Sequence, residues 1–229
     1  ALSLLPSTMW RLAADALRQQ QSPSRVLRDL VTARWPDAAS RLSTLRADAA
    51  AAIERAQARG ITAIVWSNPA YPAALTTIPD PPPVLWTRGR GDALSALSVA
   101  IVGSRAATPY ALSVAAQLAG DLAARGVVVV SGLARGVDSA AHRGALAAGG
   151  ITVGVLGSGV DVIYPREHAA LAAEIDVSGA VISELVPGTP PTPFFFPLRN
   201  RIISGLARAV VVVEANQKST EEFRMLLMP

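Results

Sequence analysis

Arginines and small polar residues follow the ends of several hydrophobic runs in this chain. Gly103-Ser104-Arg105 follows the run 99–102, and Ser131-Gly132 with Arg135 follows the run 127–130. Guanidinium groups bind phosphate through paired donors, and small residues let backbone N–H groups approach an anion. Arg166 follows a third such loop, and Arg199-Asn200-Arg201 opens a predicted helix. The pattern predicts an anion site, with phosphate as the best-suited group.

The hydrophobic runs themselves indicate how these residues are brought together. Short valine-rich runs without alternation are typical of strands buried on both faces, and helical stretches separate them, so we expect a parallel α/β sheet. Ligands bind beyond the carboxyl ends of the strands in such sheets. The anion site is therefore predicted at that edge. The five predicted strands are 99–102, 127–130, 153–156, 180–182 and 210–213.

The helices between these strands carry recognisable end signals. Thr108-Pro109 supplies an N-cap and a first-turn proline for a helix to residue 125. Asp138 is predicted to cap a helix that runs to residue 148, with His142 on its face. Two further helices are expected over residues 165–175 and 200–208.

The chain divides into several predicted parts. Residues 1–60 form a small helical domain, with helices expected at 9–20, 23–33 and 38–59. Residues 61–97 are a proline-rich connector packed on the next domain, with strands at 61–65 and 84–86. Residues 98–219 form the α/β domain, and residues 220–229 are interpreted as a remnant of a C-terminal region.

Composition favours a soluble, cytoplasmic protein. The chain has 229 residues, is 51% hydrophobic and carries a formal net charge of +4. Its apolar runs are shorter than the ~20 residues that a membrane helix needs. The sequence contains no cysteine, which excludes disulfides and thiolate metal sites. A modest positive charge permits nucleic acid as a partner but does not demonstrate it.

Motifs of common enzymes are absent. The loops lack the G-x-G-x-x-G spacing of dinucleotide sites, the P-loop pattern and the G-x-S-x-G elbow. Ser131, Asp138 and His142 lie close in sequence, but a helix cap and a helix-face residue explain the last two better than a catalytic triad. His168 belongs to a separate helix, so a histidine metal site is not indicated. We predict no catalytic residue, metal or cofactor.

Two interpretations of the arginines and of one aromatic cluster remain open. The arginines bind an anion, or they form salt bridges with Asp138, Asp161, Glu184 and Glu214. Phe194-Phe195-Phe196 is flanked by prolines and is therefore predicted to lie outside a helix. Its rings either pack beneath a loop or form a stacking platform for bases beside Arg199.

Several of these segments resemble the DprA/Smf DNA-processing proteins of natural transformation. The resemblance covers about residues 60–216, in order, and includes part of the connector. The matching segments are Ile101–Arg105 with Thr108 and Tyr110, Ser131–Asp138 with Ala141-His142, Gly157–Asp161 with Tyr164-Pro165, Phe196–Leu206 and Val210–Ala215.

The resemblance implies an extended Rossmann-like fold, preceded here by a small helical (SAM-like) domain. It also implies a homodimer that binds single-stranded DNA without known catalysis, protects incoming DNA and helps to load the RecA recombinase. Carried over, the DNA contacts are Ser104, Arg105, Arg199, Asn200, Arg201 and one phenylalanine of the cluster. With the predicted anion site, the candidate DNA-binding residues are Gly103, Ser104, Arg105, Ser131, Gly132, Arg135, Arg166, Phe194, Phe195, Phe196, Arg199, Asn200 and Arg201.

An enzyme remains the alternative. The nucleoside-monophosphate phosphoribohydrolases of the lysine-decarboxylase-like group have a related architecture and a P-G-G-x-G-T-x-x-E loop. The corresponding strand end here reads Glu214-Ala215-Asn216-Gln217-Lys218, without glycine. The family that the chain resembles usually has a glycine-serine loop at this point, so Asn216-Gln217-Lys218-Ser219 departs from that pattern as well.

Overall fold

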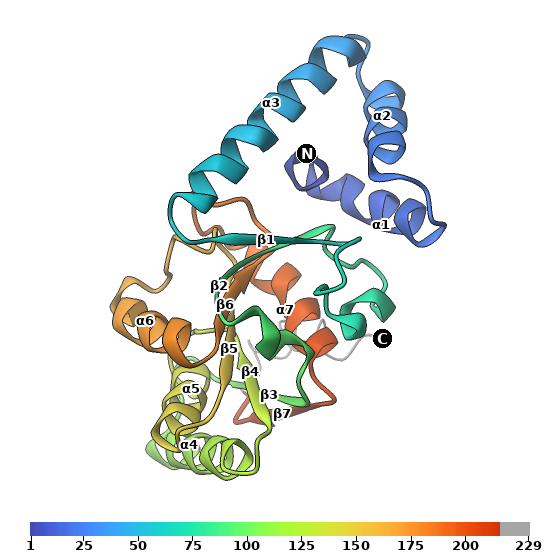
Figure 1. Cartoon of the computed structure of the whole chain (residues 1–229). Coiled ribbons are helices and arrows are strands. Elements are labelled where there is room, and N and C mark those ends of the chain that lie inside the picture. Colours follow the sequence, from blue (N-terminus) through green and yellow to red (C-terminus); the bar gives the residue numbers. More distant parts are fainter. Residues whose placement is uncertain (216–229) are drawn as a thin grey trace.

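A computed structural model describes residues 1–215, so the predicted tail and the Asn216–Ser219 segment lie outside the described residues. Seven strands form one sheet, with helices on both of its faces (Figure 1). The strands are β1 (Thr62–Val65), β2 (Val84–Gly89), β3 (Ser98–Gly103), β4 (Val128–Ser131), β5 (Thr152–Val155), β6 (Ala180–Ser183) and β7 (Ala209–Val213). The helices are α1 (Trp10–Arg18), α2 (Pro23–Arg34), α3 (Ala38–Gln57), α4 (Pro109–Ala123), α5 (Val137–Ala147), α6 (Ala169–Ser178) and α7 (Phe195–Leu206).

The strand order confirms the predicted Rossmann-like α/β fold. The sheet runs β1-β2-β6-β5-β4-β3-β7, and the pairings from β6 through β7 are all parallel. Each of the five predicted strands is present within two residues of its expected bounds. Every residue of β4, β5 and β6 is buried, which explains why valine and isoleucine fill these strands without alternation.

The segment predicted as a connector contributes two strands to this sheet. β2 pairs antiparallel with β6, and β1 pairs antiparallel with β2, so both extend the sheet beyond its parallel part. The proline-rich stretch between them also contains a short 3₁₀ helix, Ala73–Thr77, which packs on α7. The connector is therefore part of the layer that supports the site.

Helices α4, α5 and α6 cover one face of the sheet, and α7 covers the other (Figure 1). Alanine lets the first layer pack closely: Ala115 and Ala119 of α4 and Ala141 of α5 are fully buried against Ile101 of β3. On the opposite face, Ile202 and Ile203 of α7 pack in one cluster with residues of the central strands. A helix on each face is what strands buried on both sides require.

Helices α1, α2 and α3 confirm the three helices expected at the start of the chain. They enclose a cluster of their own that includes Leu17, Val26, Val31 and Leu45, with Trp66 of the following segment packed against it. Within residues 1–215, none of the helices is both long and apolar enough to cross a membrane.

Three predicted helix starts in the α/β domain differ from the structure. Helix α6 begins at Ala169, four residues after its predicted start, and the 3₁₀ helix Arg166–His168 precedes it. The N-cap of α5 is Gly136, and Asp138 lies inside the first turn, where its carboxylate accepts hydrogen bonds from the preceding loop. Helix α7 begins at Phe195, five residues before its predicted start, and Phe194 is its N-cap. The prediction that the phenylalanine cluster lies outside a helix is therefore wrong for Phe195 and Phe196. Pro197 falls in the first turn of α7, where a missing N–H group breaks no helical hydrogen bond.

Candidate nucleic-acid interface

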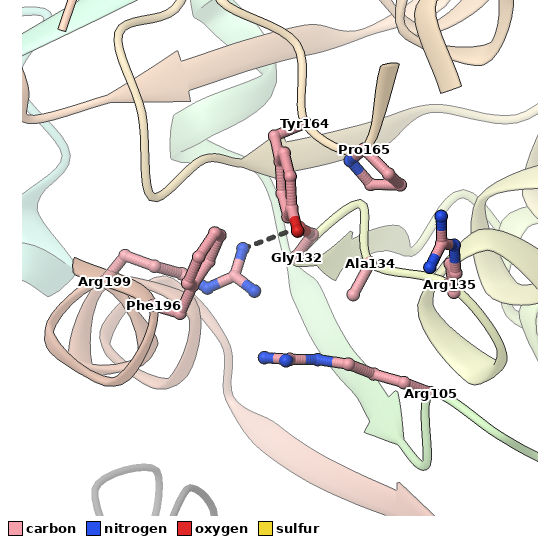
Figure 2. A pocket seen from close by; sticks show the side chains of 8 residues that line it. All are labelled: Arg105, Gly132, Ala134, Arg135, Tyr164, Pro165, Phe196 and Arg199. Atoms are coloured by element: carbon pink, nitrogen blue, oxygen red, sulfur yellow. Dashed lines mark hydrogen bonds between the residues drawn. The ribbon is translucent and has the colours of Figure 1, made fainter. Parts of the chain in front are cut away.

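A pocket of about 110 Å³ opens at the carboxyl ends of β3, β4 and β5. This is the edge at which the sequence predicts the ligand site. Figure 2 shows the residues that line the pocket. They come from the loops that follow β3, β4 and β5 and from helix α7. The lining residues are Arg105, Gly132, Ala134, Arg135, Tyr164, Pro165, Phe196 and Arg199.

Arg199 forms the floor of the pocket and ties α7 to the sheet. Its Nη1 donates to the carbonyl oxygen of Gly132 at 2.6 Å and to that of Val155, at the ends of β4 and β5. Its Nε donates to Oδ1 of Asn200 at 3.1 Å. A side chain at Gly132 would collide with this guanidinium, so glycine is required for the contact. Arg199 is only 5% exposed, and its hydrogen bonds hold the two strand ends together.

Three of the loop amides that small residues place at this edge already have protein partners. The N–H groups of Gly132 and Ala134 donate to Oδ2 of Asp138, and the N–H of Ser104 donates to the carbonyl oxygen of Glu214. Asp138 thus takes the position that a bound anion would need at the first two amides. An anion in this pocket must rely on the arginine side chains rather than on these amides.

Buried titratable groups lie beneath the pocket, among them Asp138 and His142. Burial raises the pKa of the Asp138 carboxyl, while Arg199 and the loop amides act in the opposite direction. His142 lies in the same region and is fully buried. Burial lowers its pKa to about 3, and the neighbouring His168 and Arg199 add to this effect. His142 is therefore neutral at physiological pH.

The hydrogen bonds of His142 fix which ring nitrogen carries the proton. The hydroxyl of Thr152 donates to the carbonyl oxygen of Val129 at 2.7 Å, so it must accept from Nδ1 of His142, which lies 2.7 Å away. His142 and Ser131 do not form a triad, because the Ser131 hydroxyl donates to the carbonyl oxygen of Ile101. Within residues 1–215, no group of three or more metal-binding side chains is present.

Arg201 lies inside the protein rather than at the pocket. Its guanidinium makes two hydrogen bonds to the Glu184 carboxylate, at 2.7 and 2.6 Å, and its Nε lies 2.8 Å from a carboxylate oxygen of Asp80. Burial disfavours the charge of Arg201, but Glu184 and Asp80 outweigh this and raise its pKa. The sequence predicts a DNA contact for Arg201, whereas the structure shows the alternative salt bridge to Glu184.

The other acids named in that alternative have different partners. Asp161 pairs with Arg59, at the end of the helical domain, at 2.5 Å. Glu214 accepts from the backbone N–H and the hydroxyl of Thr108, at the start of α4. Arg135 pairs instead with Glu167, which the sequence does not suggest.

An aromatic wall stands on one side of the pocket. The rings of Phe196 and Tyr164 have centroids 5.4 Å apart and are inclined by 39°. The exposed side chain of Arg105 places its Cζ 5.6 Å from the centre of the Phe196 ring. Figure 2 shows Arg105 and Phe196 reaching the pocket from different elements. This places a cation and an aromatic ring together at one opening.

The remaining predicted residues have supporting positions. Phe194 is 60% exposed and packs edge-on against Phe195, at 5.7 Å, and neither ring lines the pocket. Ser104 and Gly103 are required for the packing of the β3 end: the hydroxyl of Ser104 accepts from the N–H of Ala106, and a side chain at Gly103 would collide with Val213. Arg166 is exposed but does not line the pocket.

Three lining residues are missing from the predicted site: Ala134, Tyr164 and Pro165. All three belong to loops that follow predicted strands, so the rule that placed Arg105 also applied to them. Tyr164 was recognisable as an aromatic residue at such a position. The predicted site is built on arginines and small residues that bind anions, and Tyr164 has neither property.

The chain is similar to known DNA-processing proteins. It is 45% identical to Protein Smf of Escherichia coli over 150 residues, which are 65% of this chain and 40% of that protein. The crystal structure of DNA processing protein A (DprA) from Streptococcus pneumoniae has a TM-score of 0.76 and 31% identity, covering 96% of this chain and 80% of that one.

DNA processing protein A from Helicobacter pylori, studied for its single-stranded DNA binding mode, has a TM-score of 0.66 and 33% identity, covering 72% of this chain and 75% of that one. The chain thus spans less than half the length of the Escherichia coli protein. The sequence profile of DNA recombination-mediator protein A matches residues 62–221, which is more than half of the chain. This chain therefore belongs to the DNA recombination-mediator protein A family.

Proposed function

We propose that the pocket binds single-stranded DNA, with Arg105 holding a phosphate and Phe196 stacking on a base. The observation that carries this proposal is the pairing of an exposed guanidinium with an aromatic ring, 5.6 Å apart, at the ligand edge of the sheet. A guanidinium and a ring at this separation can contact neighbouring parts of one nucleotide chain. In a duplex the faces of the bases are covered by stacking on neighbouring base pairs, so stacking on a protein ring favours single strands.

The chemistry of this pair predicts tolerance of base sequence. Every base has a π-face, and phosphates carry no sequence information, so affinity should vary little among oligonucleotides. The Helicobacter pylori relative, with its single-stranded DNA binding mode, supports this choice of ligand. Arg199, Asn200 and Gly132 support the site from beneath by joining α7 to the strand ends.

The wider role that we propose follows from membership of the family. In this role, the protein processes DNA during natural transformation. It protects incoming single strands and helps to load the RecA recombinase, and it acts in the cytoplasm as a homodimer. The RecA partner and the homodimer are inferred from the resemblance of the chain to this family.

We also propose that the protein acts without catalysis. The polar groups beneath the pocket are committed to structural hydrogen bonds: the Ser131 hydroxyl to Ile101, the Asp138 carboxylate to two loop amides and His142 to Thr152. A phosphoribohydrolase would release ribose 5-phosphate from AMP. Incubation with AMP should give no release above that of a buffer control, and sustained release would favour the enzyme.

A binding titration tests the proposed ligand. Fluorescence anisotropy with labelled oligonucleotides should show tighter binding to single strands than to blunt duplexes of the same sequence. Affinity for single strands should fall as salt rises, with a log–log slope of about −0.7 for each phosphate contact. Equal affinity for duplex, or no response to salt, would contradict the proposal.

A further inference from the structure

We propose that Tyr164 and Arg135 form a second nucleotide subsite beside Phe196 and Arg105, and that the carboxylate of Glu167 occupies its phosphate position in the DNA-free protein. This inference rests on the proposed function, because the second subsite is meant for the next nucleotide of the same strand. It concerns the side of the pocket formed by the loops after β4 and β5.

Tyr164 supplies the surface for a second base. Its ring is 48% exposed and lines the pocket, although its side chain contacts Phe196. Because the two rings touch each other at an inclination of 39°, a base cannot be inserted between them. The rings instead form one bent wall, and each can stack on its own base. Two adjacent bases of a single strand fit such a wall better than one base would.

Arg135 supplies the matching cation. It lines the same pocket, and its Nε and Nη2 donate to the two carboxylate oxygens of Glu167 at 2.5 and 2.9 Å. This two-pronged geometry is also how a guanidinium binds two oxygens of a phosphate. Glu167 therefore marks the direction in which Arg135 presents its donors, and a phosphate at that position would be bound in the same way.

The Arg135–Glu167 ion pair is exposed enough for a phosphate to replace the carboxylate. The side chains of Arg135 and Glu167 are 63% and 54% exposed, in contrast to the Arg201–Glu184 pair, at 9% and 4%. An exposed ion pair is worth little in water, so a phosphate of a bound strand can displace the carboxylate at small cost. Glu167 then weakens DNA binding, because the strand must first replace it.

The sharpest test is the Glu167→Gln variant. It keeps the size of the side chain and removes the competing charge, so affinity for a single-stranded oligonucleotide should rise about two- to five-fold. The salt slope should steepen by up to about 0.7, because a displaced Glu167 takes up a cation that the glutamine does not need.

Glu174→Gln is the matched control. Glu174 is exposed and lies seven residues further along, in α6, so the variant makes the same change of net charge nearby without an Arg135 contact. Its affinity and salt slope should equal those of the wild type. Equal gains for the two variants would mean a general charge effect and would overturn the proposal. With Arg135→Ala already present, Glu167→Gln should have no further effect.

Tyr164 is tested by a pair of substitutions. Tyr164→Ala should weaken single-strand binding at least about five-fold, whereas Tyr164→Phe keeps the ring and should bind like the wild type. Melting temperatures should stay close to that of the wild type for both. Binding by Tyr164→Ala at wild-type affinity would overturn the second subsite.

Failure of this inference is distinguishable from failure of the proposed function. If Arg105→Ala weakens binding but the Tyr164 and Glu167 variants behave like the wild type, only the second subsite is wrong. If the wild type does not bind single strands, the proposed function itself is wrong.

Discussion

Two pairs of arginines near the same sheet edge have opposite environments. Arg199 and Arg201, in α7, are 5% and 7% exposed, and carbonyl oxygens or carboxylates of the protein accept their hydrogen bonds. Arg105 and Arg135, in loops after β3 and β4, are exposed. The difference teaches that a cluster of arginines at a ligand edge is not one functional unit. The buried pair holds parts of this edge together through hydrogen bonds within the protein, and we propose that the exposed pair binds the ligand.

The largest expected effect that tests the difference between buried and exposed arginines is a loss of folding stability. Replacing Arg201 by alanine leaves the buried Glu184 carboxylate without its cation, and breaking a buried pair in this way costs about 3–5 kcal/mol. We expect a free energy of unfolding lower by about that amount in urea denaturation. An Arg201→Ala protein as stable as the wild type but defective in DNA binding would break the comparison, because Arg201 would then be a ligand contact.

A smaller effect separates the phenylalanines that begin α7. Phe196→Ala removes the proposed stacking ring and should cost about 1–3 kcal/mol of single-strand binding free energy. Because Phe196 is partly exposed, it should lose less stability than the about 3–5 kcal/mol of a fully buried phenylalanine. Phe194→Ala is the matched control: Phe194 is 60% exposed and lies outside the pocket lining, so binding should not change. If only Phe194→Ala weakened binding, the stacking ring would be Phe194 rather than Phe196.

The smallest effect concerns the neutral histidine beneath the buried arginine. The pKa of His142 in the folded protein is about 3, below its usual 6.5, so the unfolded chain binds a proton that the folded one excludes. Stability should therefore fall as the pH drops below about 6.5, by about 1 kcal/mol per pH unit between pH 6 and 5. His142→Gln should show a shallower dependence than the wild type over this range. Equal slopes for the two proteins would contradict the assignment of a neutral His142.

Much of the fold could be predicted because its signals are local. The buried strands are valine-rich and stop at glycine or polar loops, and Thr108-Pro109 marks the start of α4 by side-chain chemistry alone. The start of α7 could not be predicted in this way, because Pro197 is compatible either with a loop or with a first helical turn. Phe196 packs closely against Gly157, and this contact favours the first helical turn over a loop.

The position of the site could be predicted from the sequence, but which of its arginines are buried and which are exposed could not. The rule for parallel sheets placed Arg105, Gly132 and Arg135 at one edge, as observed. Whether an arginine points inward depends on acceptors far away in the sequence: Glu184 and Asp80 for Arg201, and the ends of β4 and β5 for Arg199. Likewise, the contact of Tyr164 with Phe196 joins segments 32 residues apart and follows only from the fold.

The measurement that tests the central claim most directly compares Arg105→Ala with Arg125→Ala. Both variants remove one exposed arginine, but Arg125 lies between α4 and β4, at the opposite end of the sheet, where it donates to the carbonyl oxygen of Asp121. Anisotropy titrations with a single-stranded oligonucleotide should show a loss of about 1–3 kcal/mol for Arg105→Ala and none for Arg125→Ala, with unchanged melting temperatures. Equal affinities of the two variants would contradict a binding role for the exposed arginines at this pocket.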